Sequence, residues 1–176
     1  MSYIYKDKLY ISSLPSLQEL ERYHSIVHLQ HWINVSGIDI HQIYPKPALL
    51  GYSISQFDFA DVFTNGKILT DFSSLEQIST HLYKRVSELK HRRAFLEAVK
   101  ALITQIEKYN TTGIFCHRGL ARSPLVAAAA LNHLHNESLA QSIDRVQQLH
   151  SPAYFTDISV SALLWCKGQL NNGIST

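Results

Sequence analysis

The apolar run Gly113-Ile114-Phe115 leads directly into a tight loop and then into an alanine-rich helix, and this order constrains the fold more than any other feature. Pro124 suits the first turn of a helix, because the N–H that proline lacks has no intrahelical partner there. Leu125 to His133 continue the helical pattern. The segment therefore predicts a strand, a tight loop and a helix in succession, which is a building unit of α/β sheets.

Strand and helix patterns alternate along the rest of the chain. Leu9–Ser13, His31–Ser36 and residues 52–59 indicate strands, and Ser16 with Glu19 forms the S-x-x-E capping-box pattern that begins a helix. Further helices are predicted at about residues 75–89, 94–109, 138–149 and 156–170, with His91-Arg92-Arg93 as a polar interruption. The alternation predicts an α/β fold, a central and mostly parallel sheet flanked by helices, in a single domain over residues 1–176.

Composition excludes several classes of function. The 176 residues are 45% hydrophobic and 17% charged, and a net charge of +2 is too small to indicate nucleic-acid binding. No apolar run reaches the ~18 residues of a membrane span, and the N-terminus lacks the apolar core of a signal peptide. Two cysteines, Cys116 and Cys166, do not make a disulfide framework. We therefore expect a reducing, cytoplasmic location.

The loop after Phe115 holds a spacing with chemical meaning. Five residues separate Cys116 from Arg122, with Gly119 in the middle and Ser123 after the arginine. A thiolate that attacks a phosphate monoester needs donors for the phosphoryl oxygens and a fixed positive charge. The N–H groups of a curled loop and the start of a helix supply the donors, and the planar guanidinium of an arginine binds two oxygens at once.

This chemistry predicts a role for each loop residue. Cys116 is the expected nucleophile and Arg122 the phosphate clamp, while Ser123 would hydrogen-bond the sulfur and help it leave. Gly119 permits a positive φ and removes a Cβ from the path of the phosphate. The remaining phosphate-binding positions are His117, Arg118, Leu120 and Ala121.

The run CHRGLARSP resembles the C-x-x-G-x-x-R-S signature of the protein tyrosine and dual-specificity phosphatases. LYISSLPSLQEL with HWINVSG, and the tail HSPAYFTDISVSALL, are similar to flanking elements of the same superfamily. The resemblance implies a phosphatase fold that hydrolyses phosphate monoesters on a phosphoprotein, of tyrosine or dual specificity. The reaction would pass through a phosphocysteine intermediate and need no cofactor.

In that superfamily a loop aspartate protonates the leaving group and then activates water. QFDFADV resembles this loop, which implies Asp61 as the acid, with Asp58 as the alternative and Asp71 as a weaker third. The 55 positions between Asp61 and Cys116 exceed the usual spacing, so we interpret the region near residues 70–93 as an inserted helical segment. Phe115 stands where the superfamily usually has histidine.

Two alternative functions remain open at this stage. Phe115 favours a catalytically weak phosphate-binding module, and a basic residue within the loop, Arg118, favours a phosphoinositide phosphatase. The expected partner is a phosphorylated protein, with no nucleic acid and no membrane span, and the oligomeric state is open. No metal is expected, because His24, His28, His31 and His41 match no metal-binding spacing.

Overall fold

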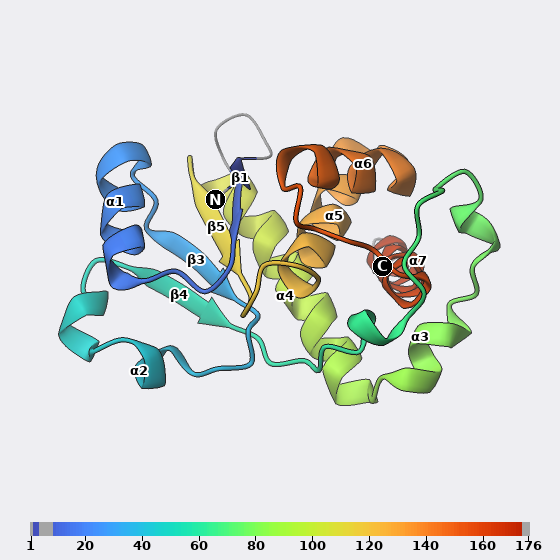
Figure 1. The fold of residues 1–176 in the computed structure, drawn as a ribbon, viewed down its shortest axis with the longest axis horizontal. Coiled ribbons are helices and arrows are strands. Elements are labelled where there is room, and N and C mark those ends of the chain that lie inside the picture. The colour runs from blue at the N-terminus through green and yellow to red at the C-terminus, as the bar shows by residue number, and fades with distance from the viewer. Residues whose placement is uncertain (1, 4–8, 174–176) are drawn as a thin grey trace.

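The computed structural model describes residues 2–3 and 9–173 and shows an α/β fold built on a five-stranded sheet (Figure 1). The strands lie in the order β1-β2-β5-β3-β4; β1 pairs antiparallel with β2, and the other pairs are parallel. The predicted, mostly parallel sheet is therefore confirmed. The strands are β1 (Ser2–Tyr3), β2 (Leu9–Ser12), β3 (His31–Asn34), β4 (Ser53–Gln56) and β5 (Thr112–Phe115).

Strand β5 lies at the centre of the sheet, and all of its residues are buried. Its register places Gly113 beside Trp32, whose ring fills the space that a Cβ at position 113 would need. Because β2, β3 and β5 are parallel, the loops after Ser12, Asn34 and Phe115 leave the sheet at the same edge. In open α/β sheets, this carboxyl edge of the strands is where ligands bind.

Helices flank the sheet on both faces (Figure 1). The helices are α1 (Leu17–Val27), α2 (Ile40–Ile43), α3 (His81–Val86), α4 (Leu89–Lys108), α5 (Arg122–His135), α6 (Leu139–Leu149) and α7 (Asp157–Asn172). Short 3-10 helices lie at Lys46–Leu49, Phe63–Asn65 and Leu75–Gln77. Within the described residues, none of these helices combines the length and the apolar character that crossing a bilayer requires.

The predicted capping box at the start of α1 is confirmed. Ser16 Oγ accepts from Glu19 N at 3.2 Å, and Glu19 Oε2 accepts from Ser16 N at 2.7 Å. The same reciprocal arrangement begins α6 at Ser138 and α7 at Thr156. Each box satisfies backbone N–H groups that the first turn of a helix cannot pair internally.

The sheet separates two hydrophobic cores of different size. The larger core joins the sheet to α4, α5, α6 and α7 and includes Cys116 and Cys166. The smaller core lies against α1 and α2 and includes Trp32 and Phe115, whose rings meet edge to face at 5.8 Å between centroids. Side chains alternate between the faces of a strand, so Phe115 points away from the face that holds Cys116.

The helical segment predicted near residues 70–93 is present, but it is divided differently from the expectation. The predicted helix at 75–89 consists of a 3-10 turn and α3, and His91-Arg92-Arg93 lie inside α4 instead of interrupting it. The division brings Tyr83 and Phe95 to 6.1 Å between ring centroids. One continuous helix would hold these two rings about 18 Å apart along its axis. Burial of both rings in one cluster therefore outweighs local helix propensity.

Candidate active site

Residues 116–121, here called the Cys116 loop, join β5 to α5 at the carboxyl edge of the sheet. Cys116 is buried at the start of the loop, and its Sγ lies 3.2 Å from Ser123 Oγ. Ser123 is itself buried in the first turn of α5. The sulfur therefore lies at the N-terminal end of a helix, beside a hydroxyl that can donate a hydrogen bond to it.

Carbonyl groups of the Cys116 loop are held by donors from outside the loop. Leu14 N donates to His117 O at 3.3 Å, Tyr154 N donates to Leu120 O at 3.2 Å, and His150 Nε2 lies 2.7 Å from Gly119 O. In a planar trans peptide the N–H points opposite to the C=O. The N–H groups of the residues that follow these carbonyls, Arg118, Leu120 and Ala121, therefore point away from the surrounding donors, as an anion-binding loop requires.

Gly119 makes the tight curve of this loop possible. Its φ is +69°, a region that residues with a side chain rarely adopt. A Cβ at this position would lie 2.8 Å from Ser13 N and 3.0 Å from the carbonyl carbon of Ser12. The loop therefore rests directly on the backbone that follows β2, and only glycine fits there.

His150 holds the loop from the segment between α6 and α7. Its side chain is buried, and burial lowers the pKa of His150, while its hydrogen bond to Gly119 O opposes that shift. A neutral imidazole with its proton on Nε2 donates to Gly119 O and adds no positive charge to that of Arg122 beside the loop. His150 opens the tail HSPAYFTDISVSALL, but its contact with the loop could not be predicted, because it lies 31 positions from Gly119.

Arg122 is fixed by the loop that follows β3. Its Nη1 donates to Ser36 O at 2.8 Å, and its Nε is buried without a hydrogen-bond partner among the described residues. The nearest carboxylate oxygen, Asp61 Oδ2, lies 3.6 Å from Nε. One side of the guanidinium is thus anchored on Ser36 O, while Nε on the other side forms an ion pair with Asp61, where an oxyanion would compete with the carboxylate.

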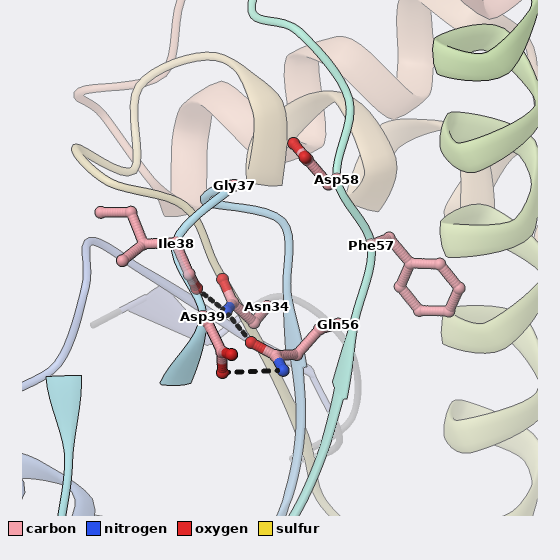
Figure 2. A pocket seen from close by; sticks show the side chains of 7 residues that line it. All are labelled: Asn34, Gly37, Ile38, Asp39, Gln56, Phe57 and Asp58. Carbon is pink, nitrogen blue, oxygen red and sulfur yellow. Dashed lines mark hydrogen bonds between the residues drawn. The ribbon is translucent and has the colours of Figure 1, made fainter. Parts of the chain in front are cut away.

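Two amide side chains brace the loop that carries Ser36. Asn34 Nδ2 donates to Ile38 O at 2.8 Å and to Gln56 Oε1 at 3.0 Å (Figure 2). Gln56 Oε1 also accepts from Ile40 N at 2.8 Å. Asn34 Oδ1 accepts from Ser36 N at 2.9 Å. The ends of β3 and β4 therefore determine where the carbonyl that anchors Arg122 lies.

A cavity of about 380 Å³ opens above the Cys116 loop. The predicted residues that line it are Asp61, Cys116, His117, Arg118, Leu120, Ala121 and Arg122. Thr64 and Tyr154 also line it and were not predicted. Burial raises the pKa of Tyr154, and the charge of Asp61 adds to the shift, so this phenol stays protonated beside the cavity.

The three candidate acids lie in different places. Asp61 lines the cavity of Cys116. Asp58 lines a neighbouring cavity of about 250 Å³ together with Gly37 and Phe57 (Figure 2). Asp71 lines neither of these cavities; it accepts from Ser73 N at 2.9 Å, and its hydrogen bonds with Ser73 lower its pKa. Of the three, only Asp61 lines the same cavity as the thiol.

The segment that carries Asp61, residues 57–65, is anchored on the larger core. The rings of Phe59 and Phe63 are buried and lie 6.3 Å apart between centroids. Phe63 O accepts from Thr156 Oγ1 at 2.6 Å, so the N-cap of α7 also holds this segment. The position of Asp61 therefore depends on contacts far along the chain.

This fold is that of the protein tyrosine and dual-specificity phosphatases, as the signature at Cys116 predicted. The chain is similar to the crystal structure of PTPMT1, with a TM-score of 0.68 and 12% identity over 100% of both chains. It is also similar to Tk-PTP in its active form (TM-score 0.62, 18% identity, 92% of each chain). Human DUSP28 gives a TM-score of 0.59 at 17% identity, over 98% of this chain and 99% of that one.

No protein-family model and no curated protein sequence matches the chain. At identities between 12% and 18%, the likeness to solved structures establishes the fold alone. The chemistry of the site therefore has to be argued from the residues of this chain.

Proposed function

We propose that the protein is a cysteine-dependent phosphatase that hydrolyses phosphate monoesters on a phosphoprotein. One observation supports this above the others: the thiol of Cys116, the guanidinium of Arg122 and the carboxyl group of Asp61 line one cavity at the N-terminal end of α5. Nucleophile, charge clamp and proton donor are the groups that this reaction needs.

The proposed reaction has two steps. The thiolate of Cys116 attacks phosphorus; the S–P bond forms, the bond between phosphorus and the ester oxygen breaks, and Asp61 gives its proton to the leaving oxygen. Asp61 then takes a proton from water, which attacks phosphorus and releases phosphate and the thiolate. Loop N–H groups and Arg122 Nε bind the phosphoryl oxygens throughout, and Ser123 Oγ, 3.2 Å from the sulfur, stabilises it as it leaves.

Asp61 is proposed as the acid in preference to Asp58. Asp61 shares the cavity of Cys116, whereas Asp58 lies in the neighbouring cavity, beside Gly37. Phe115 does not weaken the proposal, because its ring lies in the smaller core on the opposite face of the sheet from Cys116. Hydrogen bonds to the loop come instead from Leu14, His150 and Tyr154.

A phosphoinositide is the second candidate substrate. The chain is similar to PTPMT1 in complex with PI(5)P, with a TM-score of 0.67 and 13% identity over 98% of this chain and 97% of that one. Arg118 is exposed at the rim of the cavity, where it can meet a second anionic group. A phosphoprotein remains the first choice, because Arg118 is the one arginine within the Cys116 loop and adds a single positive charge beyond that of Arg122.

Turnover of a phosphotyrosine peptide and of an aryl phosphate tests the proposal. We expect Cys116→Ser to abolish turnover of both while retaining vanadate or phosphate binding, because the loop donors and Arg122 remain. We expect Asp61→Asn to lower kcat by about 10²-fold or more on the peptide, whose leaving group needs the proton. Turnover of phosphoinositide vesicles, measured alongside, separates the two substrate classes.

Matched variants make the result decisive. Asp58→Asn changes the same functional group in the neighbouring cavity, and we expect it to retain most of the activity. Full activity of Cys116→Ser would overturn the proposal. Anion binding by the wild-type protein without turnover of any of these substrates would instead establish a phosphate-binding module.

A further inference from the structure

The run His91-Arg92-Arg93 belongs to the first two turns of α4, and the proposed reaction gives it no role. Figure 1 shows the chain after β4 passing the N-terminal end of α4. His91 and Arg92 form hydrogen bonds with the backbone of neighbouring segments. They connect α4 to the segment that carries Asp61 and to the end of α3.

His91 contacts the backbone immediately before Asp61. Ala60 N donates to His91 Nδ1 at 3.2 Å. Because a backbone N–H can only donate, Nδ1 must carry its lone pair, and the ring proton must lie on Nε2. The hydrogen bond therefore fixes the backbone of Ala60 relative to α4, one residue from the carboxyl group that lines the cavity.

A second contact with α4 lies on the other side of Ala60. The ring of Phe59 is buried and lies 5.6 Å from the ring of Phe95, centroid to centroid. Phe95 follows His91 by four positions, so both side chains lie on the same face of α4. Helix α4 thus holds two consecutive residues before Asp61, one by a hydrogen bond and one by a buried ring.

Arg92 fixes the start of α4 itself. Its Nη1 donates to Lys84 O at 3.2 Å and also to Ser87 O. These carbonyls belong to the end of α3 and to the residue that terminates it. The N-terminal turn of α4 is therefore tied to its neighbour, which makes it a firm support for the imidazole of His91.

We propose that His91 is a positioning residue for the acid: its Nδ1 holds Ala60 so that the carboxyl group of Asp61 lies within reach of the leaving oxygen. This inference rests on the proposed function. His91 does not line the cavity of Cys116 and touches no reacting group. Its effect is on proton transfer, because displacement of an acid by about 1 Å is enough to slow a reaction by orders of magnitude.

Two substitutions of His91 separate the hydrogen bond from the bulk of the ring. His91→Asn keeps an acceptor, since Oδ1 of asparagine occupies nearly the same place as Nδ1. His91→Leu has a similar branched shape and cannot accept. Arg93→Gln is the matched control, because Arg93 is the exposed member of the run.

The measurement compares kcat and KM on two aryl phosphates, one with a well-stabilised phenolate as leaving group and one with phenolate itself. We expect His91→Leu to lower kcat on phenyl phosphate by about tenfold, part of the 10²–10⁴-fold that an acid contributes. Activity on the better leaving group, KM and vanadate inhibition should stay within about twofold of wild type. His91→Asn and Arg93→Gln should match wild type on both substrates.

Equal losses on both substrates, weaker vanadate inhibition, or failure of His91→Asn to restore the rate would each overturn the inference. So would an additional loss from His91→Leu in an Asp61→Asn background, because without the acid there is nothing to position. Absence of turnover by the wild-type protein would overturn the proposed function instead. In that case the amide resonance of Ala60, followed by NMR in the Leu and Asn variants, still tests the hydrogen bond.

Discussion

Gly119 shows how one residue without a side chain determines the geometry of the candidate site. Its positive φ and its contact with the backbone of Ser12 and Ser13 bend the chain so that the following N–H groups converge. The sequence signature places glycine at this position, and the structure supplies the reason. A Cβ would separate the Cys116 loop from the end of β2.

We expect Gly119→Ala to destabilise the protein by about 1–3 kcal/mol, since a strained backbone region is forced on alanine. It should also weaken vanadate binding, because the loop must move away from Ser13 N. Gly168→Ala is the matched control: Gly168 lies within α7, and a Cβ there meets nothing within 4 Å. This control should gain up to about 1 kcal/mol from helix propensity. Urea denaturation and vanadate titration measure both variants, and unchanged binding by Gly119→Ala would contradict the account.

The residues of the Cys116 loop could be predicted from sequence because they are contiguous. A strand, five intervening residues and a helix start supply the thiol, the donors and the guanidinium within one local pattern. The residues that hold this loop could not be predicted in the same way. Ser36 lies 86 positions from Arg122, and His150 lies 31 positions from Gly119, so only the tertiary fold brings them together.

Among the elements, the capping boxes show where local signals were sufficient and where they were not. Ser16 with Glu19 was recognised as a helix start, and the predicted helices at 138–149 and 156–170 correspond to α6 and α7. The boundary between α3 and α4 was misplaced, because it is determined by the packing of Tyr83 and Phe95 and not by local propensity. Thr156, the N-cap of α7, has a second contact that no local pattern could indicate.

Thr156→Ala should cost about 0.5–2 kcal/mol, as expected for loss of an N-cap. We also expect it to lower kcat, because Thr156 Oγ1 donates to Phe63 O in the segment that carries Asp61. Ser138→Ala removes the equivalent cap from α6 and serves as the control. It should lose a similar free energy of unfolding with unchanged kcat. Equal kcat values for the two variants would show that the link from α7 does not hold the Asp61 segment.

At the scale of the whole molecule, parallel strands gather the loops of the site at one edge of the sheet. The Cys116 loop is held by Leu14 after β2, by Ser36 after β3 through Arg122, and by His150 and Tyr154 between α6 and α7. Local loop geometry therefore depends on global packing. A titratable group within these contacts makes the stability of the whole fold sensitive to pH.

His150 is that group, and the sign of its effect follows from the direction of its shift. Burial lowers the pKa of His150 in the folded protein below its ordinary value of 6.5. Between these two values the unfolded chain binds a proton that the folded protein does not, so the free energy of unfolding decreases as the pH falls through this window. The stability that neutral His150 contributes is fully present above its ordinary pKa of 6.5.

We expect His150→Gln to remove this pH-dependent part of the free energy of unfolding, since Nε2 of glutamine can still donate to Gly119 O but does not titrate. Urea denaturation of both proteins, at a series of pH values above and below 6.5, gives the difference in free energy of unfolding. The variant should become more stable relative to wild type as the pH falls. His133→Gln, at an exposed position on α5, is the control and should follow the wild-type dependence. If wild type and His150→Gln lose stability in parallel, the acid sensitivity of the fold arises elsewhere and His150 does not link the Cys116 loop to pH.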